Sequence, residues 1–223
     1  MYWKDEGYLL SKNNFDENST IIEAFTLEHG KYTGIVYGGS SRKQKGKFQI
    51  GNKFLINWKS KNENRSGYFN IELIKPVSPF FFDDKKRSAC ILSAASILKI
   101  LLPERQINEK IYNSFEKMLS ELNSKNWINL YIHWELSLIR DLGYETNLSN
   151  KKNLDDKDKD FIKINNRSLK IPKMLFNQDD KVNYDSEIKE ALIFNKNLLM
   201  ENFILPNKLR FPLFRKILEK YYN

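Results

Sequence analysis

Hydrophobic and polar residues alternate along the first third of the chain in short runs that are typical of β-strands. Residues 53–58 place Phe54, Ile56 and Trp58 on one face. The same character recurs in four further runs, at residues 7–12, 20–26, 32–37 and 68–74. β-branched and aromatic residues bounded by Gly, Asn and Ser favour strands. Five strands without helical spacers predict a small closed antiparallel sheet, of which the OB-type barrel is the commonest form with a nucleic-acid-binding face.

The period of the pattern changes after residues 75–79 (KPVSP), where two prolines stop a strand and forbid a helix. Beyond this connector the apolar residues recur at helical spacing. The expected helices cover residues 84–102, 108–122, 127–142, 186 onward and 208–222, and Gly143 is placed to end the third of them. The sequence therefore predicts an α+β protein with a five-stranded OB-fold domain at residues 1–78 and an all-helical domain at residues 79–223.

Residues 149–181 interrupt the helical half with a polar, charge-dense segment that is poor in apolar residues. At most two short strands are expected there, near residues 161–164 and 168–171. We interpret this segment as a surface insertion or a partly disordered loop in the helical domain.

The charge of the chain is unevenly distributed. The net charge of +9 and the pI near 9.3 favour an acidic partner, either nucleic acid or an anionic membrane, although a Lys- and Asn-rich composition from an AT-rich genome would also raise the pI. Residues 1–30 hold two lysines against six carboxylates, whereas residues 31–75 hold ten cations against two carboxylates. Compositional drift would not separate the signs in this way, so the positive charge is a local feature.

The loop at residues 34–48 (GIVYGGSSRKQKGKF) combines a glycine pair, which lets the backbone come close to a ligand, with a run of cations, which can neutralise the phosphates of a polyanion. A solvated hairpin turn in a basic protein is the alternative interpretation. Trp58 could offer a stacking face or belong to the core, and the alternation of its strand suits either. The predicted DNA-binding residues are Arg42, Lys43, Lys45, Lys47, Lys53, Lys59 and Tyr37, with Lys61 and Arg65 extending the track.

The sequence offers little to support catalysis. Cys90 is the only cysteine, which excludes an intrachain disulfide and favours a reducing compartment. His29 falls in an expected turn and His133 on the third helix. No glycine-rich phosphate loop, metal motif or nucleophile elbow is found. The absence of a leader and of a membrane-length apolar run favours the cytoplasm. We expect a binding protein, not an enzyme, without a cofactor or a metal.

The order and spacing of several motifs resemble the RecO recombination mediators of bacterial DNA repair, and particularly their alphaproteobacterial members. The motifs are residues 3–7 (WKDEG), 23–30 (EAFTLEHG), 34–42 (GIVYGGSSR), 49–52 (QIGN) and 134–144 (WELSLIRDLGY). The resemblance implies a nucleoid-associated protein that binds single- and double-stranded DNA and anneals complementary strands. With RecR, it would help RecA replace single-stranded DNA-binding protein (SSB), whose acidic C-terminal tail it would contact.

Two departures from the family pattern affect these expectations. Many members carry a zinc ribbon that would begin near residue 150, but this chain has no cysteine there, so a zinc-free remnant is expected at residues 149–181. A basic residue often precedes the aromatic-Glu-Leu motif as part of the tail-binding surface, and here that position is His133, with Arg140 nearby as a second candidate. An OB-fold protein–protein adaptor or an RNA-binding module without a repair role stays open as an alternative.

Overall fold

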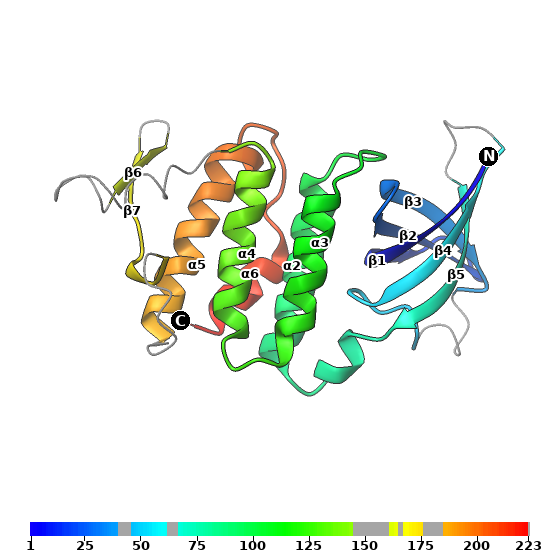
Figure 1. Cartoon of the computed structure of the whole chain (residues 1–223), viewed down its shortest axis with the longest axis horizontal. Helices are drawn as coiled ribbons and strands as arrows, with labels where there is room; N and C mark the ends of the chain where they lie inside the picture. Colours follow the sequence, from blue (N-terminus) through cyan, green and yellow to red (C-terminus); the bar gives the residue numbers. More distant parts are fainter. Residues whose placement is uncertain (40–45, 62–66, 145–160, 165–166, 176–184, 223) are drawn as a thin grey trace. The chain divides into compact units, whose positions relative to one another are not determined.

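A computed structural model describes residues 1–39, 46–61, 67–144, 161–164, 167–175 and 185–222 of the 223-residue chain (Figure 1). The expected insertion at residues 149–181 therefore lies largely outside the described residues. The chain divides into two compact units, Met1–Leu119 and Ser120–Asn223. The first unit extends beyond residue 78, where the sequence predicts a domain boundary. That domain boundary stays a prediction.

Five strands of the first unit close into a barrel in the order β1-β2-β3-β5-β4 (Figure 1). They are β1 (Tyr2–Asn14), β2 (Ser19–Thr26), β3 (Gly30–Tyr37), β4 (Lys53–Lys59) and β5 (Gly67–Lys75). All neighbouring pairs are antiparallel except β3 and β5, which run parallel. Closure leaves the sheet without a free edge. The expected five-stranded OB-type barrel and the α+β class are confirmed.

β1 is long enough to join both sides of the barrel. Its first half pairs with β4, from Tyr2 opposite Lys59 to Tyr8 opposite Lys53, and its second half pairs with β2. The register shifts between Leu9 and Ser11, as at a β-bulge that bends a strand around a closed sheet. Inward side chains of the strands and of Phe48 form the barrel core: Leu9, Ile22, Ala24, Val36, Phe48, Phe54, Ile56, Trp58 and Phe69.

Two helices complete the first unit after the short 3-10 helix η1 (Ser78–Phe81). They are α2 (Lys85–Leu101) and α3 (Glu109–Ser120), whose last residue begins the second unit. Asp84 caps α2, because its side chain accepts a hydrogen bond from the backbone N–H of Arg87 at 2.9 Å. Pro103 follows the C-cap residue Leu102. The start and end expected for this helix are confirmed.

The second unit is mainly helical. Its elements are η2 (Glu121–Asn123), α4 (Trp127–Asp141), β6 (Phe161–Ile164), β7 (Arg167–Lys170), η4 (Lys173–Leu175), α5 (Asp185–Leu199), the π-helix η5 (Met200–Ile204) and α6 (Leu213–Lys220). Gly143 adopts a positive φ of 96° after α4, as expected for a helix end. The expectation of a helix from residue 208 is wrong, since α6 begins only after Pro212. No helix among the described residues is long and apolar enough to cross a membrane.

Candidate nucleic-acid interface

A row of exposed side chains crosses the outer face of the barrel from β1 to β3. Tyr2 lies opposite Lys59, and Lys59 lies opposite Tyr68. Directly opposed residues of antiparallel strands point to the same face. Tyr37 on β3 continues the row, because its ring stacks on that of Tyr68 with centroids 5.0 Å apart and an interplanar angle of 19°. We call Tyr2, Lys59, Tyr68 and Tyr37 the outer row.

The outer row is open to solvent. Tyr2, Tyr37 and Tyr68 are 65%, 66% and 45% exposed, and Lys59 is exposed as well. A parallel line of polar side chains follows on the same face, formed by Lys4, Asn57 and Asn70. The Tyr2 hydroxyl donates to Asn57 Oδ1 at 3.0 Å and so orients its ring. Aromatic faces beside cations provide both contacts that a single strand needs, namely stacking for bases and charge for phosphates.

The inner face of the same strands belongs to the core. Trp3, Trp58 and Phe69 lie opposite one another across β1, β4 and β5, one residue along from the outer row. Trp58 is only 3% exposed, and its ring stacks on that of Trp3 at 5.6 Å. The alternative left open by the sequence is therefore resolved, because Trp58 is a core residue and not a stacking platform on the surface.

The cationic loop expected to bind DNA is only partly visible. Arg42, Lys43 and Lys45 lie outside the described residues. Lys47 is exposed, and its carbonyl accepts a hydrogen bond from Asn52 Nδ2 at 3.0 Å. Because Tyr37 ends β3 directly before this loop, the loop begins at one end of the outer row.

Lys53, another of the expected DNA-binding residues, is engaged within the first unit. Its ammonium lies 2.8 Å from Glu6 Oε2 and 2.8 Å from Glu116 Oε1. Burial disfavours the charge, but the hydrogen bonds that the ammonium donates to Glu116 and Glu6 outweigh burial and raise the pKa of Lys53. Two carboxylates therefore already neutralise the Lys53 ammonium, and the exposed Lys59 of the outer row is the better candidate for a phosphate contact.

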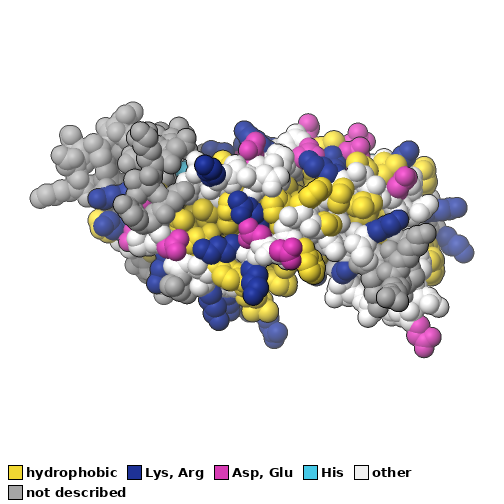
Figure 2. All heavy atoms as spheres, turned by 90° about the horizontal axis from the view of Figure 1, so that it is seen from below, with side chains coloured by type: hydrophobic (Ala, Val, Ile, Leu, Met, Phe, Trp, Pro, Cys, Tyr) yellow, Lys and Arg dark blue, Asp and Glu magenta, His cyan; other side chains and the backbone are white. Residues whose placement is uncertain are grey.

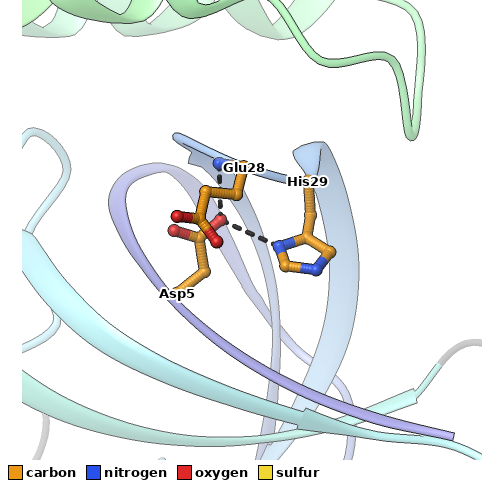
Figure 3. A group of neighbouring side chains, drawn as sticks. All are labelled: Asp5, Glu28 and His29. Atoms are coloured by element: carbon orange, nitrogen blue, oxygen red, sulfur yellow. Dashed lines mark hydrogen bonds and ion pairs between the residues drawn. The ribbon is translucent and has the colours of Figure 1, made fainter.

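A small polar cluster lies where β2 turns into β3 (Figure 3). Asp5 Oδ2 accepts from the backbone N–H of Glu28 at 2.8 Å and from His29 Nδ1 at 3.0 Å, and Asp5 Oδ1 accepts from the backbone N–H of Glu6 at 2.7 Å. Carboxylate and imidazole groups are metal ligands, but these hydrogen bonds already account for the buried Asp5 carboxylate. The cluster therefore serves to fasten the turn to β1.

Comparisons with known proteins cover both units. A family model described as "Recombination protein O N terminal" matches residues 1–77, and one described as "Recombination protein O C terminal" matches residues 83–192. The chain belongs to the RecO family. It is 33% identical over 145 residues to the DNA repair protein RecO of Roseobacter denitrificans, which covers 65% of this chain and 60% of that protein.

The chain matches somewhat under two thirds of the length of its RecO relatives. It is 32% identical over 149 residues to the DNA repair protein RecO of Cereibacter sphaeroides and over 151 residues to that of a Wolbachia strain, in each case over 67% of this chain and 62% of the relative. The similarity therefore shows that the chain belongs to the RecO family of DNA repair and recombination proteins. It does not by itself show the activity of the whole protein.

Asn52, the last residue of the motif at residues 49–52, has a clear structural role. Asn52 is completely buried, and its Oδ1 accepts from the backbone N–H groups of Val77 and Ser78 at 2.8 and 3.1 Å. Its amide nitrogen holds the carbonyl of Lys47. One side chain therefore joins the end of the cationic loop to the connector between barrel and helices.

The two candidate residues for partner binding lie on α4. His133 is half-buried, and burial lowers its pKa, so it is neutral at pH 7. Arg140 is exposed and lies 3.5 Å from Asp141. The two residues are seven positions apart and so share one side of the helix. Arg140 is the better candidate for a carboxylate partner, since only it is charged at neutral pH.

Only part of the outer row could be predicted from the sequence. Tyr68 could have been predicted, because the alternation along its strand places it on the other face of the sheet from Phe69, Ile71 and Leu73. Tyr2 could not, since the first strand was expected to begin only at Gly7. On the face drawn in Figure 2, Lys and Arg side chains are scattered among neutral and apolar ones, so clustered charge alone would not have located a site there.

Proposed function

We propose that this RecO-family chain is a recombination mediator that binds single- and double-stranded DNA and anneals complementary strands. The observation that carries the proposal is the outer row, in which three exposed tyrosine rings flank an exposed lysine on an OB-type barrel. With RecR, the protein would help RecA to replace SSB on single-stranded DNA. The role is one of binding and not of catalysis.

We expect two kinds of contact along the outer row, base stacking on the tyrosine rings and phosphate contacts with the cations. The Tyr37–Tyr68 stack would receive bases, at about 1–3 kcal/mol per stacked base, without regard to their identity. Lys59 and Lys47, with the loop cations Arg42, Lys43 and Lys45, would contact phosphates and release counterions. A cationic surface that holds two strands lowers their mutual repulsion and favours annealing.

Equilibrium binding of a fluorescent single strand, measured by anisotropy over a range of salt concentrations, tests the outer row. Tyr68→Ala should weaken binding about fivefold or more at every salt concentration. Lys59→Gln should reduce the slope of log K against log salt by about 0.7. Lys85→Gln, which removes an exposed cation from α2, is the matched control. Wild-type affinity and slope in both row variants would remove the outer row from the DNA site.

The same assay separates the alternatives. A protein–protein adaptor would not bind the strand at moderate salt. An RNA-binding module would release DNA to a small excess of RNA of the same sequence. Annealing of SSB-coated complementary strands, with and without RecR, then tests the mediator role directly.

For the SSB tail, we propose α4, with Arg140 and His133 at the contact. Arg140→Glu should weaken the binding of an acidic tail peptide more than His133→Glu, because only Arg140 carries charge at pH 7. Lys216→Glu on α6 is the matched charge reversal. Equal affinity in all three variants would place the tail elsewhere.

A further inference from the structure

A pocket of about 430 Å³ opens in the first unit, where β1 begins and β4 ends. It is lined by Met1, Tyr2, Trp3, His29, Tyr32, Trp58 and Arg105. Trp58 contributes a buried surface, whereas Tyr2 and Arg105 are exposed. A hollow of this volume is within the range of small-molecule sites, and its walls are mostly aromatic rings.

The rings are held in a fixed arrangement. Trp3 stacks on His29 with centroids 4.3 Å apart, and on Trp58 at 5.6 Å. Tyr32 stands edge-on to Trp3 and Trp58, at interplanar angles of 76° and 69°. His29 Nδ1 donates to Asp5, and Figure 3 shows Nε2 on the opposite side of the imidazole. Such preformed ring faces and edges suit a planar aromatic ligand and require little reorganisation.

The described residues of the lining carry charge of one sign. Among them, Arg105 is the only one with a permanently charged side chain, and none is a carboxylate. The guanidinium lies 5.3 Å from the centroid of Tyr32, and within the described part of the chain it forms no ion pair. The backbone N–H of Arg105 donates to the Lys31 carbonyl at 2.8 Å, which ties the residue to β3. A ligand that adds an anion to an aromatic plane would match this pocket.

We propose that the pocket binds one unpaired nucleobase of a single DNA strand, with the adjoining phosphate against Arg105. The inference rests on the proposed DNA binding and extends it from a stacking surface to a defined base pocket. Tyr2 links the two features, because it belongs both to the outer row and to the pocket lining. A strand that follows the outer row toward Tyr2 therefore reaches the pocket.

Photocrosslinking with 5-iodouracil, followed by peptide mapping, tests the pocket on the whole chain. Replacing Trp3 or Tyr32 risks unfolding the barrel, so the variant is Arg105→Asn. Asn suits the positive φ of 59° at this position. Lys85→Gln is the matched loss of an exposed cation outside the lining. We expect the labelled single strand to crosslink to Tyr2, Trp3 or Tyr32, and the blunt duplex not to do so. Arg105→Asn should reduce these crosslinks about fivefold, whereas crosslinks to Tyr37 and Tyr68 persist.

The outcomes separate the pocket from the proposed function. Salt-sensitive binding with crosslinks confined to Tyr37 and Tyr68 would overturn the pocket and leave DNA binding intact. If the wild-type protein did not bind the single strand at all, both the pocket and the proposed DNA binding would be overturned. Displacement of the pocket crosslink by an acidic peptide, but not by unlabelled strand, would assign the pocket to a protein partner instead.

Discussion

Arg215 and Glu135 form a bidentate ion pair in which both side chains are completely buried between α6 and α4. Arg215 Nε lies 2.6 Å from Glu135 Oε1, and Arg215 Nη2 lies 3.1 Å from Oε2. Nη2 also donates to the Leu192 carbonyl at 2.6 Å, and Tyr131 donates its hydroxyl to Glu135. Burial opposes the charge of Arg215, but the carboxylate of Glu135 outweighs burial and raises the pKa of the guanidinium.

Removing one partner of this pair should destabilise the second unit strongly. Glu135→Gln preserves shape but leaves the buried guanidinium without its main counter-charge, at a cost of about 3–5 kcal/mol. The double variant Glu135→Leu with Arg215→Met should recover much of this loss. Urea unfolding followed by far-UV circular dichroism measures both, with the exposed Arg210→Gln as control. A loss below about 1 kcal/mol for Glu135→Gln would contradict a structural role.

His133 should make the second unit less stable in mild acid. Burial lowers its pKa in the folded state, so between that value and the unfolded value near 6.5 the unfolded chain binds the extra proton. Stability is therefore complete above about pH 6.5 and falls as the pH decreases through this window. His133→Gln should remove that contribution. The measurement is the difference in unfolding free energy between wild type and variant at about pH 7.5 and 5, and a constant difference would refute the shift.

The barrel strands could be predicted from the sequence because each buries one face, and burial of one face imposes a period of two. The start of β1 escaped prediction for a physical reason. Asp5 occupies an inward, buried position where the pattern calls for an apolar residue, and it is satisfied there by His29 and the Glu28 N–H. From the sequence alone, a buried polar residue whose partners are distant in the chain cannot be distinguished from a polar residue in a loop.

The outer row could be predicted only in pieces for a similar reason. The alternation of the strands shows that Tyr68 and Lys59 point outward, but the sequence does not show which strands pair. The parallel pairing of β3 with β5 brings together Tyr37 and Tyr68, which are far apart in the sequence. The helix expected from residue 208 failed because a proline in a helix interior removes a backbone hydrogen bond, so α6 begins only after Pro212, which is its N-cap.

Glu116 should stabilise the packing of α3 on the barrel. It accepts from Tyr8 at 2.8 Å and from Lys53 at 2.8 Å. Burial acts against its charge, but the hydrogen bonds from Lys53 and Tyr8 outweigh burial and lower its pKa. Stability from this group is present above the unfolded pKa and is lost as pH falls through the folded pKa.

Glu116→Gln should cost roughly 1 kcal/mol at pH 7, a modest value because the carboxylate is partly exposed. The cost should shrink in acid, where the wild-type carboxyl also becomes neutral. Thermal unfolding at about pH 7 and 4 measures it, and Glu109→Gln, at the exposed start of the same helix, is the control. An equal cost at both pH values would argue for lost shape and not for lost charge.

Gly51 and Gly38 offer a matched pair for separating backbone strain from steric clash in the first unit. Both have positive φ, 88° and 69° respectively, so alanine at either site is strained by about 1–2 kcal/mol. A Cβ at Gly51 would lie 2.3 Å from Cγ2 of Ile91 on α2, whereas a Cβ at Gly38 would meet nothing within 4 Å. Gly51→Ala should therefore cost about 1–3 kcal/mol more than Gly38→Ala, because α2 must shift away from the barrel. Urea unfolding of the two variants measures the difference. Equal costs would mean that α2 yields without penalty and that the close contact between Gly51 and Ile91 contributes nothing to stability.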